Sequence, residues 1–168
     1  MDFEQETNMA TATIKSRPAT VTTKPVVASQ PRSIPSEWDL LGITTKTSQA
    51  GLRAIQRGFP DEAVEYFATQ SHLPQRLVLK VLRLSLPKLR DRETGRLTEE
   101  ESTRLWRLAR IHQRALCLFE GDADQAASWL QTPQWSLGKR PPILWTVTEP
   151  GAAKVEELIL QLEFGVFP

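Results

Sequence analysis

Apolar residues recur at helical spacing along most of the chain beyond residue 37, and the longest such stretch runs from Thr98 to Glu120. Its Thr-Glu-Glu-Glu start fits a capping box, and Gly121 is well placed to end it. A helix of this length spans on the order of 30 Å at about 1.5 Å per residue. Its predicted inward stripe is Leu105, Leu108, Ala109, Ala115, Leu116 and Phe119.

Shorter helices are predicted on both sides of this long one. Before it we expect a short helix with Leu52, Ile55 and Phe59, a helix capped by Asp61, a helix with Pro74 in its first turn, and a short helix capped by Ser85 and ended at Thr94-Gly95. After it we expect a helix from Asp122 to Leu130, a non-helical stretch, and a last helix from Thr148 and Pro150 to Gly165. No useful stretch alternates as a strand does, so the predicted fold class is all-α.

The first 36 residues are rich in Thr, Ser, Ala, Val and Pro and show no helical period, which predicts a disordered tail. The basic residues of this tail could touch nucleic acid, but a solvated arm is the preferred interpretation. They are Lys15, Arg17, Lys24 and Arg32.

Composition excludes several classes of protein. The 168 residues include 21 basic and 20 acidic ones, so any contact with nucleic acid must come from a local patch. A single cysteine, Cys117, rules out an internal disulfide and fits a reducing compartment. No signal peptide or membrane-spanning run is evident, and we expect a cytoplasmic protein without membrane contact. His72 and His112 fall on different predicted elements, so we expect no catalytic residue, metal or cofactor.

A local basic patch lies between residues 74 and 96, with seven basic and two acidic residues. Two short helices joined by a turn at Leu84-Ser85 are the layout of a helix-turn-helix. We expect phosphate contacts from Arg76, Lys80 and Arg83, and contacts with base edges or nearby phosphates from Lys88, Arg90 and Arg92. Charge alone does not distinguish this from a basic solvated face.

A set of motifs follows in fixed order: Arg107-Leu108-Ala109-Arg110, Trp129-Leu130, Thr132-Pro133, Leu137-Gly138-Lys139-Arg140, Gly151-Ala152 and Glu163-Phe164-Gly165-Val166. In this order they resemble the antitoxins of the Xre/MbcA/ParS group, over roughly residues 51 to 168. One position and one segment depart from the family pattern. Lys139 stands where the family has a second turn glycine, and Pro142-Ile143-Leu144-Trp145-Thr146 replaces a Pro-Leu-Asp-Leu-Leu-like segment.

The resemblance implies a DNA-binding antitoxin, usually a homodimer, that neutralises a RES-domain toxin that degrades NAD and represses its own operon. It implies an Xre-like helix-turn-helix region at residues 37 to 97, which binds operator DNA, and a toxin-binding domain at residues 98 to 168. The expected toxin-binding residues are Trp135, Leu137, Gly138, Lys139, Arg140, Glu163, Gly165, Val166 and Phe167.

Alternatives stay open at this point. One is a stand-alone helix-turn-helix regulator whose C-terminal domain dimerises or senses a partner, and another is an adaptor without DNA activity. Tryptophans are enriched at interface hot spots but also fill small cores. We expect Trp129 in the core and Trp135 at the interface, whereas Phe167 could pack internally or enter the toxin.

Overall fold

A computed structural model describes residues 34–45 and 47–165. The described residues belong to one compact unit. The basic residues of the expected tail, together with Val166 and Phe167, lie outside the described residues.

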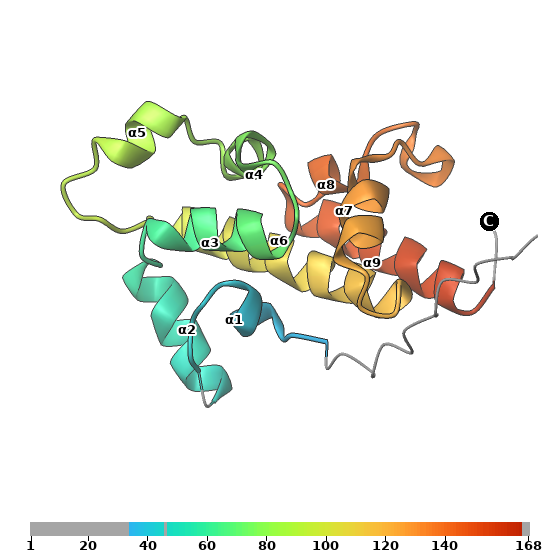
Figure 1. Ribbon diagram of the computed structural model, residues 1–168, viewed down its shortest axis with the longest axis horizontal. Coiled ribbons are helices and arrows are strands. Elements are labelled where there is room, and N and C mark those ends of the chain that lie inside the picture. The colour runs from blue at the N-terminus through green and yellow to red at the C-terminus, as the bar shows by residue number, and fades with distance from the viewer. Residues whose placement is uncertain (1–33, 46, 166–168) are drawn as a thin grey trace, which may run out of the picture. The chain divides into compact units, whose positions relative to one another are not determined.

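The all-α prediction is confirmed for the described part of the chain (Figure 1). The elements are α1 Glu37–Leu40, α2 Ser48–Arg57, α3 Glu62–Gln70, α4 Gln75–Leu82, α5 Leu86–Arg90, α6 Glu99–Leu118, α7 Ala123–Gln131, the 3-10 turn η1 Trp135–Leu137, α8 Pro142–Trp145 and α9 Glu149–Glu163. Isolated bridges join Pro60 to Arg96 and Gln134 to Arg140. None of these helices is both long and apolar enough to span a membrane.

Helix α6 is the centre of the core. It packs against α1, α2 and α4, which precede it, and against α7 and α9, which follow it. The predicted capping box is present, because Glu101 N donates to Thr98 Oγ1 at 3.2 Å and Thr98 N donates to Glu101 Oε2 at 2.8 Å. The helix ends where Gly121, with a φ of 86°, donates its N–H to the Leu116 carbonyl at 2.7 Å.

The predicted stripe of α6 is buried, apart from Phe119, which is half-buried. The buried face also includes Ile111 and His112, both with no exposed surface, which the predicted stripe left out. The His112 ring contacts Phe67 of α3 edge-on at 5.9 Å between ring centroids. Helix α6 therefore buries a broader face than predicted because helices cover it on several sides.

Helices α2, α3 and α4 each differ from the prediction in one detail. Leu52 of α2 is 56% exposed, whereas Gly51 and Ile55 form the buried face. Asp61 stands at the N-cap of α3 but makes no side-chain cap bond, because its backbone is already helical. Pro74 is the N-cap of α4 rather than a residue of its first turn.

Helix α1 was not predicted as an element, and its N-cap lies inside the segment expected to be disordered. Ser36 forms a capping box with Asp39, and Ile34 packs against the core. Trp38 lies over Gly51, where an added Cβ would come within 2.5 Å of the indole ring. This close approach explains why a glycine stands on the buried face of α2.

The stretch expected to be non-helical contains η1 and α8. Both are too short to show a helical period in sequence. Helix α8 starts with Pro142 in its first turn, directly after Pro141 at its N-cap, where the missing N–H of proline costs no hydrogen bond.

Candidate functional site

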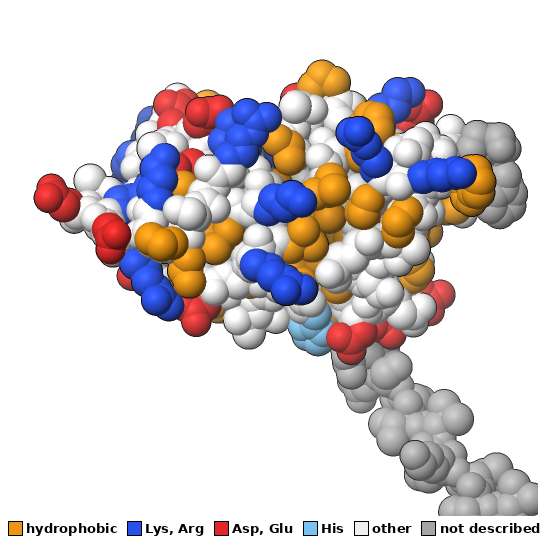
Figure 2. Space-filling model, turned by 90° about the horizontal axis from the view of Figure 1, so that it is seen from above, with side chains coloured by type: hydrophobic (Ala, Val, Ile, Leu, Met, Phe, Trp, Pro, Cys, Tyr) orange, Lys and Arg blue, Asp and Glu red, His pale blue; other side chains and the backbone are white. Residues whose placement is uncertain are grey.

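The basic patch is built on α4, α5 and the turn between them. Arg83 ends α4 in the left-handed conformation, with a φ of 58°, and Ser85 Oγ caps α5 by accepting from Lys88 N at 3.4 Å. Five expected DNA contacts have exposed side chains and form no ion pair within the described residues: Arg76, Lys80, Arg83, Lys88 and Arg90. Figure 2 shows Lys and Arg side chains spread over a face of the molecule with apolar side chains between them.

Arg92, the sixth expected DNA contact, lies beyond the end of α5 and points inward. Its side chain is 12% exposed, and its Nη1 and Nη2 donate to the Glu101 carboxylate at 2.7 and 3.0 Å. Nη1 also donates to the Arg96 carbonyl at 2.8 Å. Helix α5 therefore ends before Arg92, earlier than the expected end at Thr94-Gly95, and the Arg92 guanidinium is engaged inside the fold.

Arg92 and the capping box share the Glu101 carboxylate. Burial raises the pKa of Glu101, but the hydrogen bonds from Arg92 and Thr98 outweigh this and hold the pKa below its ordinary value. The carboxylate therefore stays ionised at neutral pH and fixes the loop after α5 to the first turn of α6.

Arg96 is exposed, but its guanidinium is hydrogen-bonded to the backbone before α3. Its Nη2 donates to the Gly58 carbonyl at 2.8 Å, beside the Leu97 N–H that donates to the Phe59 carbonyl. A Cβ at Gly58, where φ is 78°, would lie 1.9 Å from the Leu97 carbonyl oxygen, so this close approach requires glycine.

The expected toxin-binding turn centres on η1. Trp135 is 81% exposed, and Lys139 Nζ lies 4.0 Å from the centroid of its indole ring. Gly138 and Lys139 both have left-handed backbones, with φ values of 65° and 59°. This backbone gives a physical reason for the second glycine of the family pattern, which Lys139 replaces here.

The other expected residues of this turn divide between surface and core. Arg140 is exposed, whereas Leu137 is 3% exposed and packs inward. The Leu137 side chain therefore anchors the turn, which corrects its expected place on a contact surface. Contacts from the turn would come from Trp135, Lys139 and Arg140.

The end of α9 is exposed. Glu163 and Gly165 lie at the surface, and Phe164 is 77% exposed. Phe164 was not among the expected binding residues, although it stands in the last of the motifs that carry the resemblance. Helix α9 also packs against η1.

The Arg-Leu-Ala-Arg motif joins α6 to α9. Arg107 Nε and Arg110 Nη2 bind the Glu149 carboxylate at 2.5 and 2.9 Å, and Arg110 Nε lies 3.0 Å from Glu156 Oε1. Hydrogen bonds from Arg110 and then Arg107 lower the pKa of Glu149. Both arginines of this motif therefore support the fold.

Trp129 is half-buried against the core and packs on Phe119, as expected, and Trp145 is also half-buried against the core. His112 is a core residue whose Nε2 lies 3.0 Å from the Ser71 carbonyl, and burial lowers its pKa to about 4. His72 pairs with Asp124 at 2.7 Å near the surface. Within the described residues no three His, Cys, Asp or Glu side chains gather as metal ligands.

Comparisons with known proteins show which family the chain resembles. Residues 114–165 match the family described as the antitoxin Xre/MbcA/ParS C-terminal toxin-binding domain. The chain is 32% identical to the antitoxin Xre of Yersinia enterocolitica over 145 residues, which are 85% of this chain and 96% of that protein. It is 28% identical to the antitoxin Xre of Photorhabdus laumondii over 131 residues, 77% of this chain and 88% of that one.

A third relative, the antitoxin Xre of Pseudomonas putida, is 34% identical over 86 residues, 51% of this chain and 54% of that protein. The similarity to the Yersinia enterocolitica antitoxin also includes the helices before α6 that carry the basic patch, because the alignment spans most of both chains. The chain therefore belongs to the Xre/MbcA/ParS family of antitoxins.

Proposed function

We propose that this antitoxin neutralises a RES-type, NAD-degrading toxin by covering the entrance to the toxin's active site. The observation that carries the proposal is the exposed Trp135, stacked under Lys139 within the residues that match the toxin-binding domain. A large aromatic side chain on a turn anchored by Leu137 presents apolar area at little cost in conformational entropy.

The test uses the protein encoded by a neighbouring reading frame, if it is of the RES type, co-expressed with the antitoxin. We expect Trp135→Ala to weaken the complex by at least about tenfold and to restore NAD loss and growth arrest. Leu52→Ala is a matched control, because Leu52 is also exposed but lies outside the matched residues. Unchanged affinity and protection in the Trp135 variant would contradict the proposal.

The end of α9 is proposed as the second part of this contact surface. Glu163, Phe164 and Gly165 are exposed and continue into Val166 and Phe167, which lie outside the described residues. Removing residues 164–168 should lower both the affinity for the toxin and the protection of the cell. Full protection by the shortened chain, with an unchanged dissociation constant, would remove this end from the surface.

Operator binding by the α4–α5 patch is the second half of the proposed function. Five exposed cations without ion pairs in the described part of the chain suit a phosphate backbone, and Lys88 and Arg90 lie on α5, the second helix of the proposed helix-turn-helix. The pair Lys88→Gln and Arg90→Gln should abolish a gel shift on the upstream region while leaving toxin binding intact. A normal gel shift would exclude α5 as the reading helix.

Repression through two operator half-sites calls for a homodimer, because a twofold protein matches a palindromic site. Sedimentation of the free antitoxin tests this directly. A monomer that stays monomeric on DNA would contradict the dimer without affecting the toxin contact.

A further inference from the structure

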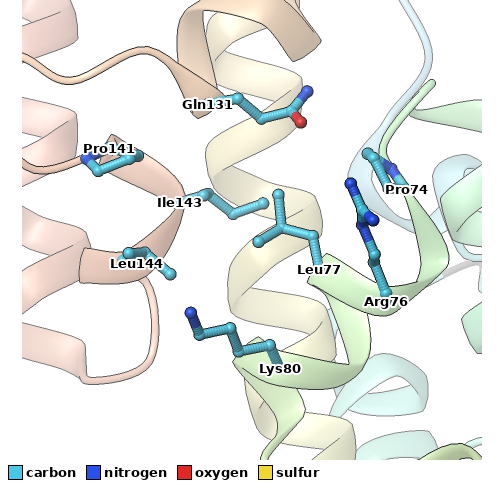
Figure 3. Close-up of a pocket in the computed structure, with 8 residues that line it drawn as sticks. All are labelled: Pro74, Arg76, Leu77, Lys80, Gln131, Pro141, Ile143 and Leu144. Carbon is cyan, nitrogen blue, oxygen red and sulfur yellow. The ribbon is translucent and has the colours of Figure 1, made fainter.

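A groove runs between α4 and α8, beside both proposed contact surfaces. Its main hollow has a volume of about 420 Å³, and its floor is formed by Leu77 of α4 with Ile143 and Leu144 of α8. Figure 3 shows Leu77 and Ile143 meeting at the centre, with Gln131 of α7 at one side. Ile143 is 1% exposed, whereas Leu77 and Leu144 are half-buried, so the floor keeps apolar surface open to a ligand.

Helix α8 also borders a further hollow. Leu144 also lines a second hollow of about 280 Å³, together with Arg140, Trp145 and Val147. Two hollows that share a wall residue fit an extended segment of chain better than a single small anion. Apolar pockets at regular intervals are the usual way in which a groove binds alternate side chains of a peptide.

Cations border this groove. Arg76 and Lys80 flank the first hollow, and Figure 3 shows Lys80 reaching from α4 toward α8. Arg140 borders the second hollow. The residues that line the two hollows include no acidic side chain, and none of the three cations forms an ion pair within the described residues.

We infer that the groove between α4 and α8 binds an acidic polypeptide segment that inserts apolar side chains between Arg76, Lys80 and Arg140. Carboxylates of such a segment complement the three cations, and its apolar side chains cover Leu77 and Leu144. DNA fits the rim but not the floor, because phosphates gain nothing from an apolar hollow.

This inference adds a regulatory consequence, which rests on the proposed operator contact. Arg76 and Lys80 are also expected to contact phosphates, so one pair of side chains serves both ligands. An acidic segment in the groove therefore displaces operator DNA, and bound DNA lowers the affinity for the segment by the same factor.

The first experiment measures the groove without DNA. The probe is a short fluorescein-labelled peptide with Leu-Phe flanked on each side by Glu residues, followed by fluorescence anisotropy on the full chain. Two comparison peptides replace Glu with Lys, or Leu-Phe with Ser-Ser. We expect the acidic apolar peptide to bind at least about tenfold tighter than either, and more weakly as salt rises.

The variants locate the site. Arg76→Gln with Lys80→Gln should weaken the acidic apolar peptide by about tenfold. Leu144→Asn should do so as well, with circular dichroism confirming its fold. The matched control is Arg53→Gln with Arg114→Gln, because these exposed cations also form no ion pair within the described residues and lie outside both hollows. Equal binding of all three peptides, or undiminished binding by the groove variants, would overturn the inference.

The second experiment adds DNA from the upstream region. Saturating acidic apolar peptide should reduce the gel shift of the unmodified chain, whereas the Lys-containing peptide should leave it unchanged. A chain that binds the peptide but never shifts DNA refutes the operator proposal and leaves the groove intact. A chain that binds both at once refutes the competition.

Discussion

Charged side chains at the first turn of α6 are buried and paired, whereas those on α4 are exposed and have no ion-pair partner within the described residues. At the first turn of α6, Arg92 and Glu101 pair at 2.7 Å with exposures of 12% and 9%. On α4, Arg76 and Lys80 are exposed and have no ion-pair partner within the described residues. All four stand in or beside one basic stretch of sequence, yet one pair holds the fold and the other can meet a ligand.

The difference teaches how to separate structural cations from cations that serve binding. A buried arginine must be paired, because an unpaired charge in the interior costs several kcal/mol. An exposed, unpaired cation contributes little to stability and is retained at little cost. Substitutions should therefore have the largest effect on unfolding where the charge is buried and the smallest where it is exposed.

The largest effect is expected at Arg92. Arg92→Met leaves the Glu101 carboxylate buried without its partner and should lower the free energy of unfolding by about 4 kcal/mol. Urea titration followed by circular dichroism measures this loss. Adding Glu101→Gln, which keeps the acceptor for Thr98 N, should recover part of it, and a single variant as stable as the unmodified chain would make Arg92 a surface cation after all.

His112 is another buried titratable group, and its Nε2 contacts the Ser71 carbonyl rather than an opposite charge. Burial lowers its pKa from 6.5 to about 4, so the unfolded chain takes up a proton first as pH falls. The contribution of neutral His112 to the free energy of unfolding is complete above pH 6.5. It falls by about 3 kcal/mol as pH falls toward 4. His112→Leu should flatten the slope of unfolding free energy against pH in this window, and an equal slope in both proteins would assign it to other groups.

Glu149 lies between the two extremes. Its side chain is 57% exposed while it binds Arg107 and Arg110, so water screens the pair. Glu149→Gln should lower the free energy of unfolding by about 1 kcal/mol in low salt and less at high salt. Lys154→Gln, which removes an exposed pair with Glu157 within α9, is the control with a smaller expected cost.

The smallest effect on stability is expected on α4. Arg76→Gln with Lys80→Gln should change the free energy of unfolding by less than about 0.5 kcal/mol. The same variant should reduce the salt dependence of operator binding, with the logarithmic slope falling by about 0.9 for each phosphate that the variant no longer neutralises. Marked destabilisation would place these cations with Arg92 rather than with the binding face.

Residues at helix starts made much of the fold predictable. Thr98 with Glu101, Asp122 and Thr148 all cap the helices expected of them, because capping depends on residues within one turn. Helices α1 and α8 and the turn η1 are too brief for a period to emerge, and they depend on packing against the core.

The candidate sites were less predictable than the helices. The pairing of Arg92 with Glu101 crosses a loop whose path is set by Arg96 and Gly58, and sequence spacing gives no measure of it. Burial of Leu137 depends on a left-handed turn at Gly138 and Lys139. The groove brings Leu77 beside Ile143 from helices far apart in the chain, so no local pattern marked it.

The position of α6 limits how members of this family can exchange parts. The matched toxin-binding region begins at Arg114, inside α6, a helix whose earlier turns bury Leu105 and Leu108 and which packs against helices on both sides of it in the chain. A chimera joined at Arg114 would combine two half-helices with unrelated core faces. Recombination that transfers toxin recognition between relatives is expected to join the chains before Thr98 and to carry the whole helix with compatible residues beneath it.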